Sequence, residues 1–317
     1  MMKKLLVIFA LLASYTAVAQ PIEKNTALYS VKETDSLYMD RYCTQGETLT
    51  PAPCMIFVFG GGFMTGARDD ARYIPFFEYI ARQGVTVISI DYRLGLKKAA
   101  ATGKLNQDTF IEAWFSTLAM AEEDLYDATN YLLTNATAWN IDPTKIITCG
   151  SSAGAITVLH GEYDLCRRTQ QARKLPAEFN YAGVISFAGA IFALGDELNW
   201  GTAHTPAPML LFHGDADRNV PYHAIREMGA GFFGSDYISK QLTANKVAHS
   251  FYSFTNTDHI VALAPMNENR YEIDSFLEKL VFEHRPLITR TEVRSLDKPT
   301  VKKEFTLTDY IQSNFAQ

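Results

Sequence analysis

The stretch Ile146-Ile147-Thr148-Cys149-Gly150-Ser151-Ser152-Ala153-Gly154 predicts a buried strand that turns sharply into a helix. Its apolar half is bounded by Pro143 and by a Gly/Ser cluster, and residues 153–159 then read as a helix. Residues 150–154 fit the pattern G-x-S-x-G, with Ser152 in the middle. Small neighbours let such a strained turn close, so the Ser152 hydroxyl would project above the sheet as a nucleophile. A plain polar turn before a helix fits the same five residues, so their surroundings must decide.

Strand-like apolar runs alternate with helical patterns along the chain. The predicted strands begin with two near the N-terminus, at 27–31 and 36–43, and continue at 54–59, 85–90, the run from 146, 182–187, 209–212 and 251–254, the last of them. The predicted helices are 72–82, 109–133, 153–159 and 267–282. This alternation predicts an α/β fold with a mostly parallel central sheet flanked by helices. Ligands bind such sheets beyond the carboxyl ends of the strands.

Four segments of chemical interest directly follow predicted strands, so they would meet at that edge of the sheet. They are Gly60-Gly61-Gly62, Ser152, Asp217 and His259. Three glycines after a buried strand let backbone N–H groups approach a ligand closely, although a flexible turn is the alternative. Neither the P-loop pattern nor the dinucleotide fingerprint is present, which disfavours phosphate binding.

Taken together, these segments resemble the α/β-hydrolase esterases, in particular the carboxylesterase and lipase branch with an H-G-G-G motif. The resemblance runs from about Cys54 to Phe282. It rests on Phe59-Gly60-Gly61-Gly62-Phe63, Asp91-Tyr92-Arg93-Leu94, Glu123-Asp124-Leu125, residues 150–154, residues 213–221 and His259. It implies the α/β-hydrolase fold, with residues 20–284 as the catalytic domain. It also implies a catalytic triad in the chain order Ser152, Asp217, His259.

The chemistry of a triad explains why these residue types are needed. Ser152 becomes a nucleophile when a histidine takes its proton, and an acid holds that imidazole in the right tautomer. The family's position favours Asp217 as the acid; Asp215 remains an alternative, followed by Asp196 and Glu197. The base is His259, with His204 as its one rival. The other histidines are expected to be surface or structural: His160, His213, His223, His249 and His284.

The resemblance implies an oxyanion hole made by the backbone N–H groups of Gly61, Gly62 and Ala153. The family motif begins with His where this chain has Phe59, which changes local packing but leaves the backbone donors in place. Aromatic side chains near these loops are expected either to shape a substrate pocket or to pack in the core. They are Phe63, Phe110, Trp114, Phe115, Phe192 and Trp200.

Both ends of the chain are expected to lie outside the catalytic domain. Residues 1–19 combine Lys3 and Lys4, an apolar run and Ala17-Val18-Ala19, which is typical of a signal peptide and predicts an exported, periplasmic or secreted protein. Export permits disulfides, and a bridge between Cys43 and Cys54 would close the loop between them. Cys149 and Cys166 are expected to be packed thiols. Residues 285–317 would form an extension that packs on the domain or on a second subunit.

Composition narrows the class of function. A net charge of -6 with both signs interspersed gives no basic stripe for nucleic acid, and no stretch after the leader is apolar enough to span a membrane. No metal or organic cofactor is expected. The sequence therefore predicts a serine carboxylesterase acting through an acyl-enzyme on short-acyl or aryl esters, carbohydrate-linked ones included. The alternatives are a serine peptidase of this fold and a non-catalytic binding protein that kept the fold.

Overall fold

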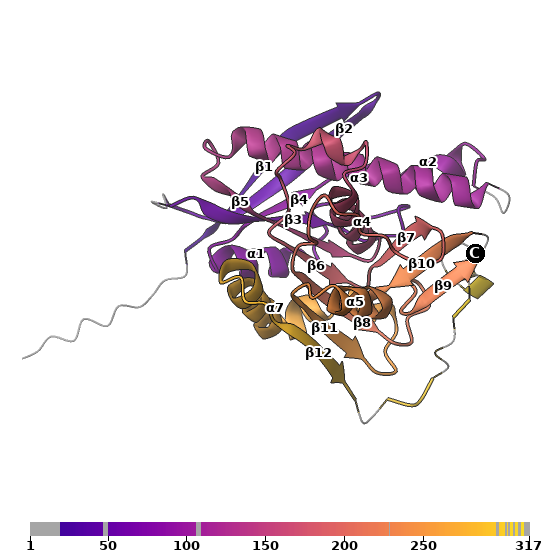
Figure 1. The fold of residues 1–317 in the computed structure, drawn as a ribbon. Helices are drawn as coiled ribbons and strands as arrows, with labels where there is room; N and C mark the ends of the chain where they lie inside the picture. The colour runs from indigo at the N-terminus through magenta and orange to yellow at the C-terminus, as the bar shows by residue number, and fades with distance from the viewer. Residues whose placement is uncertain are drawn as a thin grey trace, which may run out of the picture.

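A computed structural model describes residues 20–46, 50–105, 109–227, 229–295, 298–301, 303, 305–306, 308–309 and 312–313. The expected signal peptide, residues 1–19, lies outside these ranges. Within them the main sheet has nine strands in the spatial order β1-β2-β4-β3-β5-β6-β8-β11-β12 (Figure 1). Their bounds are β1 Ile22–Lys32, β2 Asp35–Thr44, β3 Ala52–Val58, β4 Thr86–Ile90, β5 Ile141–Ser151, β6 Gly183–Phe187, β8 Met209–Gly214, β11 His249–Phe254 and β12 Ile288–Val293.

The sheet is antiparallel only at its N-terminal edge. β1 pairs with β2 and β2 with β4 in antiparallel fashion, and the pairs from β4 to β12 are parallel. Strands β4, β6 and β8 are buried along their whole length because helices cover both faces, which explains their continuous apolar runs. The parallel part of the sheet therefore brings the loops after β3, β5, β8 and β11 to one edge.

Helices cover the two faces of the sheet (Figure 1). One face carries α2 Gly95–Ala101, α3 Phe110–Asn135, α4 Ala153–Arg167 and α5 Ser235–Ala244; the other carries α1 Ile74–Arg82, α6 Pro265–Glu268, α7 Arg270–Phe276 and the π-helical turn η3 Leu277–Phe282. Helix α4 lies very close to β3, since a Cβ at Gly154 would stand 2.0 Å from the carbonyl oxygen of Val58. Only glycine permits this approach, and it fixes where the helix begins.

The predicted element order is largely present, but helices α2 and α5 were not predicted and three further differences concern the sheets and the last helix. The strand at 251–254 is not the last, because β12 adds a parallel strand beside β11, so residues expected in a peripheral extension complete the sheet. A second sheet, in the order β7-β10-β9, follows β6 and β8. It consists of β7 Ala190–Leu194, β9 Ala224–Glu227 and β10 Ala230–Gly234. The predicted helix 267–282 is divided into α6, α7 and η3.

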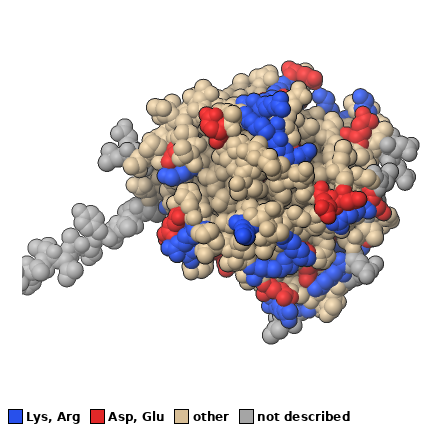
Figure 2. Space-filling model, viewed as in Figure 1, with Lys and Arg blue, Asp and Glu red and all other residues tan. Residues whose placement is uncertain are grey.

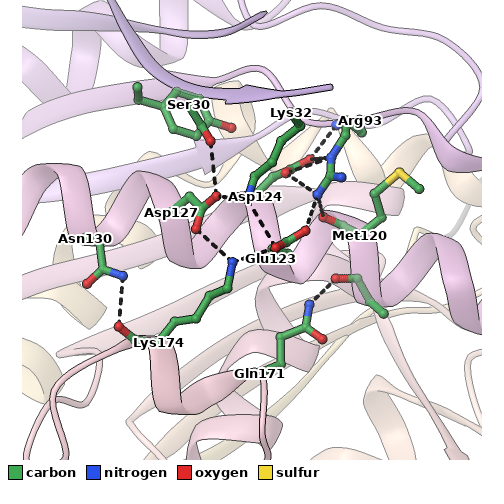
Figure 3. Close-up of polar contacts among 12 residues, drawn as sticks. Ser30, Lys32, Arg93, Met120, Glu123, Asp124, Asp127, Asn130, Gln171 and Lys174 are labelled. Carbon is green, nitrogen blue, oxygen red and sulfur yellow. Dashed lines mark hydrogen bonds and ion pairs between the residues drawn. The ribbon is translucent and has the colours of Figure 1, made fainter. Parts of the chain in front are cut away.

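An ion-pair network around Arg93 anchors the segment after β4 (Figure 3). Arg93 donates to Asp124 Oδ1 at 2.7 Å and to Glu123 Oε2 at 2.6 Å, both on α3. Lys32 of β1 and Lys174 of the short helix η1 Ala172–Lys174 also bind Glu123. Burial alone would raise the pKa of Glu123, but these three cations lower it to about 2. The network ties β1, α3 and η1 to the end of β4.

The bridge that the sequence permits between Cys43 and Cys54 is absent, and the register explains why. Both cysteines are free thiols. Cys54 pairs with Thr86 on β4, while Tyr42 of β2 pairs with Val87 on the other side of β4. Strand β4 thus separates the cysteines by two strand spacings, about 9.5 Å. Disulfides require Cα atoms closer than about 7 Å. Cys149 and Cys166 are buried, as expected of packed thiols.

The described surface carries both signs of charge. On the face drawn in Figure 2, Lys and Arg side chains are interspersed with Asp and Glu, and no continuous basic stripe crosses that face. This distribution agrees with the net charge of -6, in which both signs are interspersed along the sequence.

Candidate active site

Ser152 occupies a strained turn between β5 and α4. Its backbone has φ +51° and ψ −116°, a combination that residues with a side chain rarely adopt. The turn is held by a hydrogen bond from the Ser152 amide to the carbonyl oxygen of Phe187, 2.9 Å away. A Cβ at Gly150 would lie 2.2 Å from the carbonyl oxygen of Gly154, so the turn closes only around glycine. The Ser152 side chain is thereby directed beyond the carboxyl edge of the sheet.

His259 and Asp217 form a hydrogen-bonded chain with Ser152. His259 Nε2 lies 2.8 Å from Ser152 Oγ, and His259 Nδ1 lies 2.7 Å from Asp217 Oδ2. Since a carboxylate only accepts, Nδ1 carries the proton and Nε2 is left to accept the proton of Ser152. The His259 side chain is 23% exposed while that of Asp217 is fully buried. The chain therefore leads from a buried carboxylate to a hydroxyl at the surface.

The carboxylate of Asp217 is held in its charged form. Burial alone would raise its pKa, but the charge of His259 and the hydrogen bonds from His213 and His259 outweigh burial and lower the pKa well below its usual range. Its second oxygen, Oδ1, accepts the amides of Asn219 and Val220 at 2.8 and 3.0 Å. Asp217 is thus able to orient His259 and to stabilise a positive charge on it.

The alternative acids and the rival histidine have other surroundings. Asp215 accepts the amide of Asn256 at 2.6 Å and the ammonium of Lys303 at 2.5 Å, which joins its loop to the segment before His259 and to the C-terminal tail. Asp196 and Glu197 are exposed beyond the end of β7. His204 has no contact with Ser152 or Asp217 in the described part of the chain. The structure therefore places only His259 and Asp217 in line with Ser152.

The glycine loop after β3 lies directly beside the nucleophile. A Cβ at Gly60 would stand 3.1 Å from Ser152 Cβ, and Gly61 and Gly62 have φ values of +131° and +62°. Among the described residues the amides of Gly61 and Gly62 have no protein acceptor, and the amide of Ala153 is in the first turn of α4, where N–H groups lack intrahelical partners. These three amides are available to an oxygen bound near Ser152.

Phe59, which stands where the resemblance implies a histidine, is packed in the core. It is 2% exposed, and its ring centroid lies 4.5 Å from that of Tyr92. The Tyr92 hydroxyl donates to the Phe59 carbonyl oxygen at 3.0 Å. Aromatic packing and this hydrogen bond hold the start of the glycine loop.

A buried hydrogen-bond chain that the sequence did not reveal ties three site loops together. The Gly60 amide donates to the Tyr73 hydroxyl at 3.1 Å, Tyr73 donates to Ser151 Oγ at 3.4 Å, and Ser151 donates to the carbonyl oxygen of Ala262 at 2.8 Å. Ala262 ends the short helix η2 (His259–Ala262), which begins at the histidine. The glycine loop, the nucleophile turn and the histidine loop are therefore mutually positioned. Tyr73 lies just before α1, where no local pattern marks it.

Four of the predicted pocket aromatics form one cluster, but it belongs to the core. Trp114 contacts Phe63, Phe110 and Phe192, with ring centroids 5.5, 5.9 and 4.9 Å apart, and all four residues are at most 6% exposed. Trp200 lies elsewhere and packs on Tyr163 at 5.2 Å. These rings pack against one another because mutual contact buries more apolar surface than lining an open substrate pocket would. Phe115 is half-buried against the core.

Among the described residues no group of three His, Cys, Asp or Glu side chains could hold a metal ion. No helix among the same residues is long and apolar enough to cross a membrane.

Residues 14–160 of the chain match the carboxylesterase family. Aligned stretches are 27% identical to esterase B1 from Culex pipiens over 124 residues and 29% identical to para-nitrobenzyl esterase from Bacillus subtilis over 128 residues. Each alignment covers 39% of this chain but only 21% and 24%, respectively, of these relatives. The aligned part of the chain thus spans about a fifth to a quarter of the length of these two relatives.

Similarity to solved structures extends over most of the chain. Esterase 2 from Thermogutta terrifontis superposes with a TM-score of 0.58 at 19% sequence identity, over 82% of this chain and 94% of that one. A butyrate-bound structure of the same esterase gives a TM-score of 0.57 at 17% identity. The fold is therefore the α/β-hydrolase fold.

Proposed function

We propose that this chain, an α/β-hydrolase related to the carboxylesterases, is a serine esterase that cleaves carboxylic esters through an acyl-enzyme on Ser152. The observation that carries the proposal is the chain Ser152 Oγ, His259, Asp217, with contacts of 2.8 and 2.7 Å, at a strained strand-to-helix turn. In this scheme Ser152 is the nucleophile, His259 the general base and Asp217 the acid that orients it.

The proposed reaction has two halves. Ser152 Oγ attacks the ester carbonyl carbon while its proton passes to His259 Nε2, and the carbonyl oxygen becomes an oxyanion. The amides of Gly61, Gly62 and Ala153 would bind that oxyanion, and each such donor typically contributes roughly 10² to 10³ in turnover. The intermediate collapses, the alcohol leaves with the proton from His259, and an acyl-enzyme remains. Water activated by His259 then attacks the acyl carbon, which releases the acid and restores Ser152.

Short-acyl or aryl esters, including acyl groups on carbohydrates, are the proposed substrates. The partial exposure of His259, 23% of its side chain, and the burial of the neighbouring aromatic cluster support a shallow site that suits small acyl groups. Esterase 2 of Thermogutta terrifontis, which shares the fold, has been solved with propionate and with butyrate bound. Export is proposed on the sequence pattern of residues 1–19 alone.

Hydrolysis of p-nitrophenyl acetate, butyrate and octanoate by the wild type, Ser152→Ala and His259→Ala tests the proposal. We expect turnover that falls with acyl length and drops by roughly 10⁶ in either variant, because the two residues act as one unit. Labelling with a fluorophosphonate should reach one equivalent in the wild type and be lost in Ser152→Ala. Activity that survives Ser152→Ala would disprove the site. A wild type that neither turns over nor is labelled would favour a non-catalytic binding protein, and cleavage of peptides in preference to esters would favour a peptidase.

A further inference from the structure

A second histidine contacts the same carboxylate oxygen that binds His259. His213 Nε2 lies 3.3 Å from Asp217 Oδ2, and both side chains have no exposed surface. His213 lies near the end of β8, four residues before Asp217, which lies in the loop that follows. The turn after β8 brings the two side chains together. In this buried position a hydrogen bond between an imidazole and a carboxylate is electrostatically stronger than it would be in water.

The surroundings of His213 fix which nitrogen carries a proton. Nε2 faces two acceptors, Asp217 Oδ2 and the carbonyl oxygen of Val220, each at 3.3 Å. Only a protonated Nε2 satisfies both, so this nitrogen is a donor. Nδ1 lies 2.8 Å from the hydroxyl of Ser235 at the start of α5. The ring is also packed edge-on against Tyr222, at 5.5 Å between centroids, so its orientation is fixed on three sides.

We propose that His213 is a positioning residue that donates to the triad carboxylate and thereby sets how strongly Asp217 holds the proton on His259. This inference rests on the proposed esterase function. A donor to a carboxylate withdraws negative charge from it, which weakens its attraction for a second donor on the same oxygen. His213 therefore keeps Asp217 oriented toward His259 but weakens the attraction of Asp217 Oδ2 for the proton on His259 Nδ1.

The groups that face His213 from other elements are already engaged. Asp215 is bound by Lys303, the Tyr222 hydroxyl lies 2.6 Å from Ser253 Oγ on β11, and Asp236, which follows Ser235, is bound by His223, Lys240 and Arg290. The carbonyl oxygen of Gly189 lies 3.2 Å from Ser235 Oγ. Asp217 is thus the carboxylate that His213 contacts directly.

The test compares the pH dependence of kcat/KM for His213→Leu and His213→Gln with the wild type, using p-nitrophenyl acetate in a pH-stat. The acidic limb reports protonation of the base. In His213→Leu we expect this limb to move to higher pH by about half a unit or more, because Asp217 then holds the His259 proton more tightly. The plateau should fall roughly tenfold as the carboxylate loses a fixed position. His213→Gln keeps an N–H donor near the position of Nε2. It should therefore keep the acidic limb and the plateau of kcat/KM close to those of the wild type.

His249→Leu is the matched control. His249 is equally buried, and its nitrogens lie 2.8 Å from the Val247 carbonyl oxygen and 3.3 Å from Thr243 Oγ1, away from the triad. The His249→Leu variant should have a lower melting temperature, but the acidic limb of its kcat/KM profile should not move. If His213→Leu does not fold, Ser235→Ala, which removes the partner of Nδ1, should shift the limb in the same direction by a smaller amount.

The possible failures are distinguishable. A wild type with measurable turnover, together with an unmoved limb in His213→Leu or in its substitute Ser235→Ala, would overturn the role of His213 and leave the esterase intact. A limb that moves equally in His249→Leu would also overturn it. A wild type that neither turns over nor reacts with a fluorophosphonate would overturn the proposed function, and the role of His213 with it.

Discussion

Helix α4 has a histidine–carboxylate pair beside its N-terminus and a second pair two turns further along. Only the first pair is arranged for proton transfer. At the N-terminus of the helix, His259 joins Asp217 at 2.7 Å and presents its Nε2 to Ser152 Oγ, near solvent. Two turns further along, His160 joins Glu122 at 3.0 Å, but its Nε2 accepts the backbone amide of Phe192 at 2.9 Å. The His160 pair is 7% and 6% exposed. The partner of Nε2 therefore distinguishes the two histidines. Nε2 of His259 faces a hydroxyl proton that it can accept, whereas Nε2 of His160 is occupied by a backbone amide.

Three buried carboxylates, Asp217, Glu122 and Glu162, differ in how many histidines offset their burial. Asp217 has two histidines and two backbone amides, and its pKa is lowered despite burial. Burial raises the pKa of Glu122, which a single histidine only partly offsets. Glu162 faces no cation in the described part of the chain, and burial raises its pKa to about 7. Burial is similar in all three, so the histidine partners, and not neutral donors, decide which carboxylate stays charged.

The largest expected difference in kcat between the two pairs comes from removing the charge of the carboxylate in each. Asp217→Asn should lower kcat by roughly 10⁴, because the amide no longer selects the tautomer of His259 that accepts the Ser152 proton. Glu122→Gln should leave kcat within about threefold, since the carboxamide oxygen still accepts from His160 Nδ1. Steady-state kinetics of both variants on p-nitrophenyl acetate check this. Equal losses in the two variants would contradict the distinction between the pairs.

A smaller effect is expected from the buried tyrosine beside each pair. Tyr73→Phe should lower kcat roughly tenfold with KM nearly unchanged, because the chain from Gly60 to Ala262 loses the hydroxyl that aligns three site loops. Tyr126→Phe removes a hydroxyl that donates to the Gly161 carbonyl oxygen at 2.7 Å, next to His160. It should cost about 1 kcal/mol of stability and leave kcat unchanged. If both variants lose stability alone, the Tyr73 chain has no role in alignment.

The smallest effect concerns Glu162, the carboxylate without a cation. A carboxyl whose folded pKa is raised stabilises the protein below its unfolded pKa of about 4.3, and that stabilisation is lost as pH rises through about 7. Glu162→Gln keeps the acceptor for the Ala207 amide, which lies 2.7 Å from Oε1, but carries no charge. Its melting temperature should exceed that of the wild type at pH 8 by a few degrees and match it near pH 5. A difference that does not change with pH would show that folding does not raise the pKa of Glu162.

Local patterns were sufficient for much of the fold and for the outline of the site. The apolar runs at β3, β4, β6 and β8 predicted buried parallel strands because each run is covered on both faces. The Gly150 to Gly154 pattern predicted the turn because only small residues allow φ +51° at Ser152 beside so close a helix. Strand β12 was missed, since its residues are mostly exposed and lack the apolar run that marked the others.

The sequence by itself determined the α/β order, the nucleophile turn and the segments that end at one edge of the sheet, because periodicity and glycine act over a few residues. Only the tertiary structure chose Asp217 over Asp215, brought His213 to the same carboxylate, separated Cys43 from Cys54 and joined Tyr73 to Ser151. These choices depend on sheet register and on contacts between residues far apart along the chain. Side-chain chemistry names the candidates, and packing decides which of them meet.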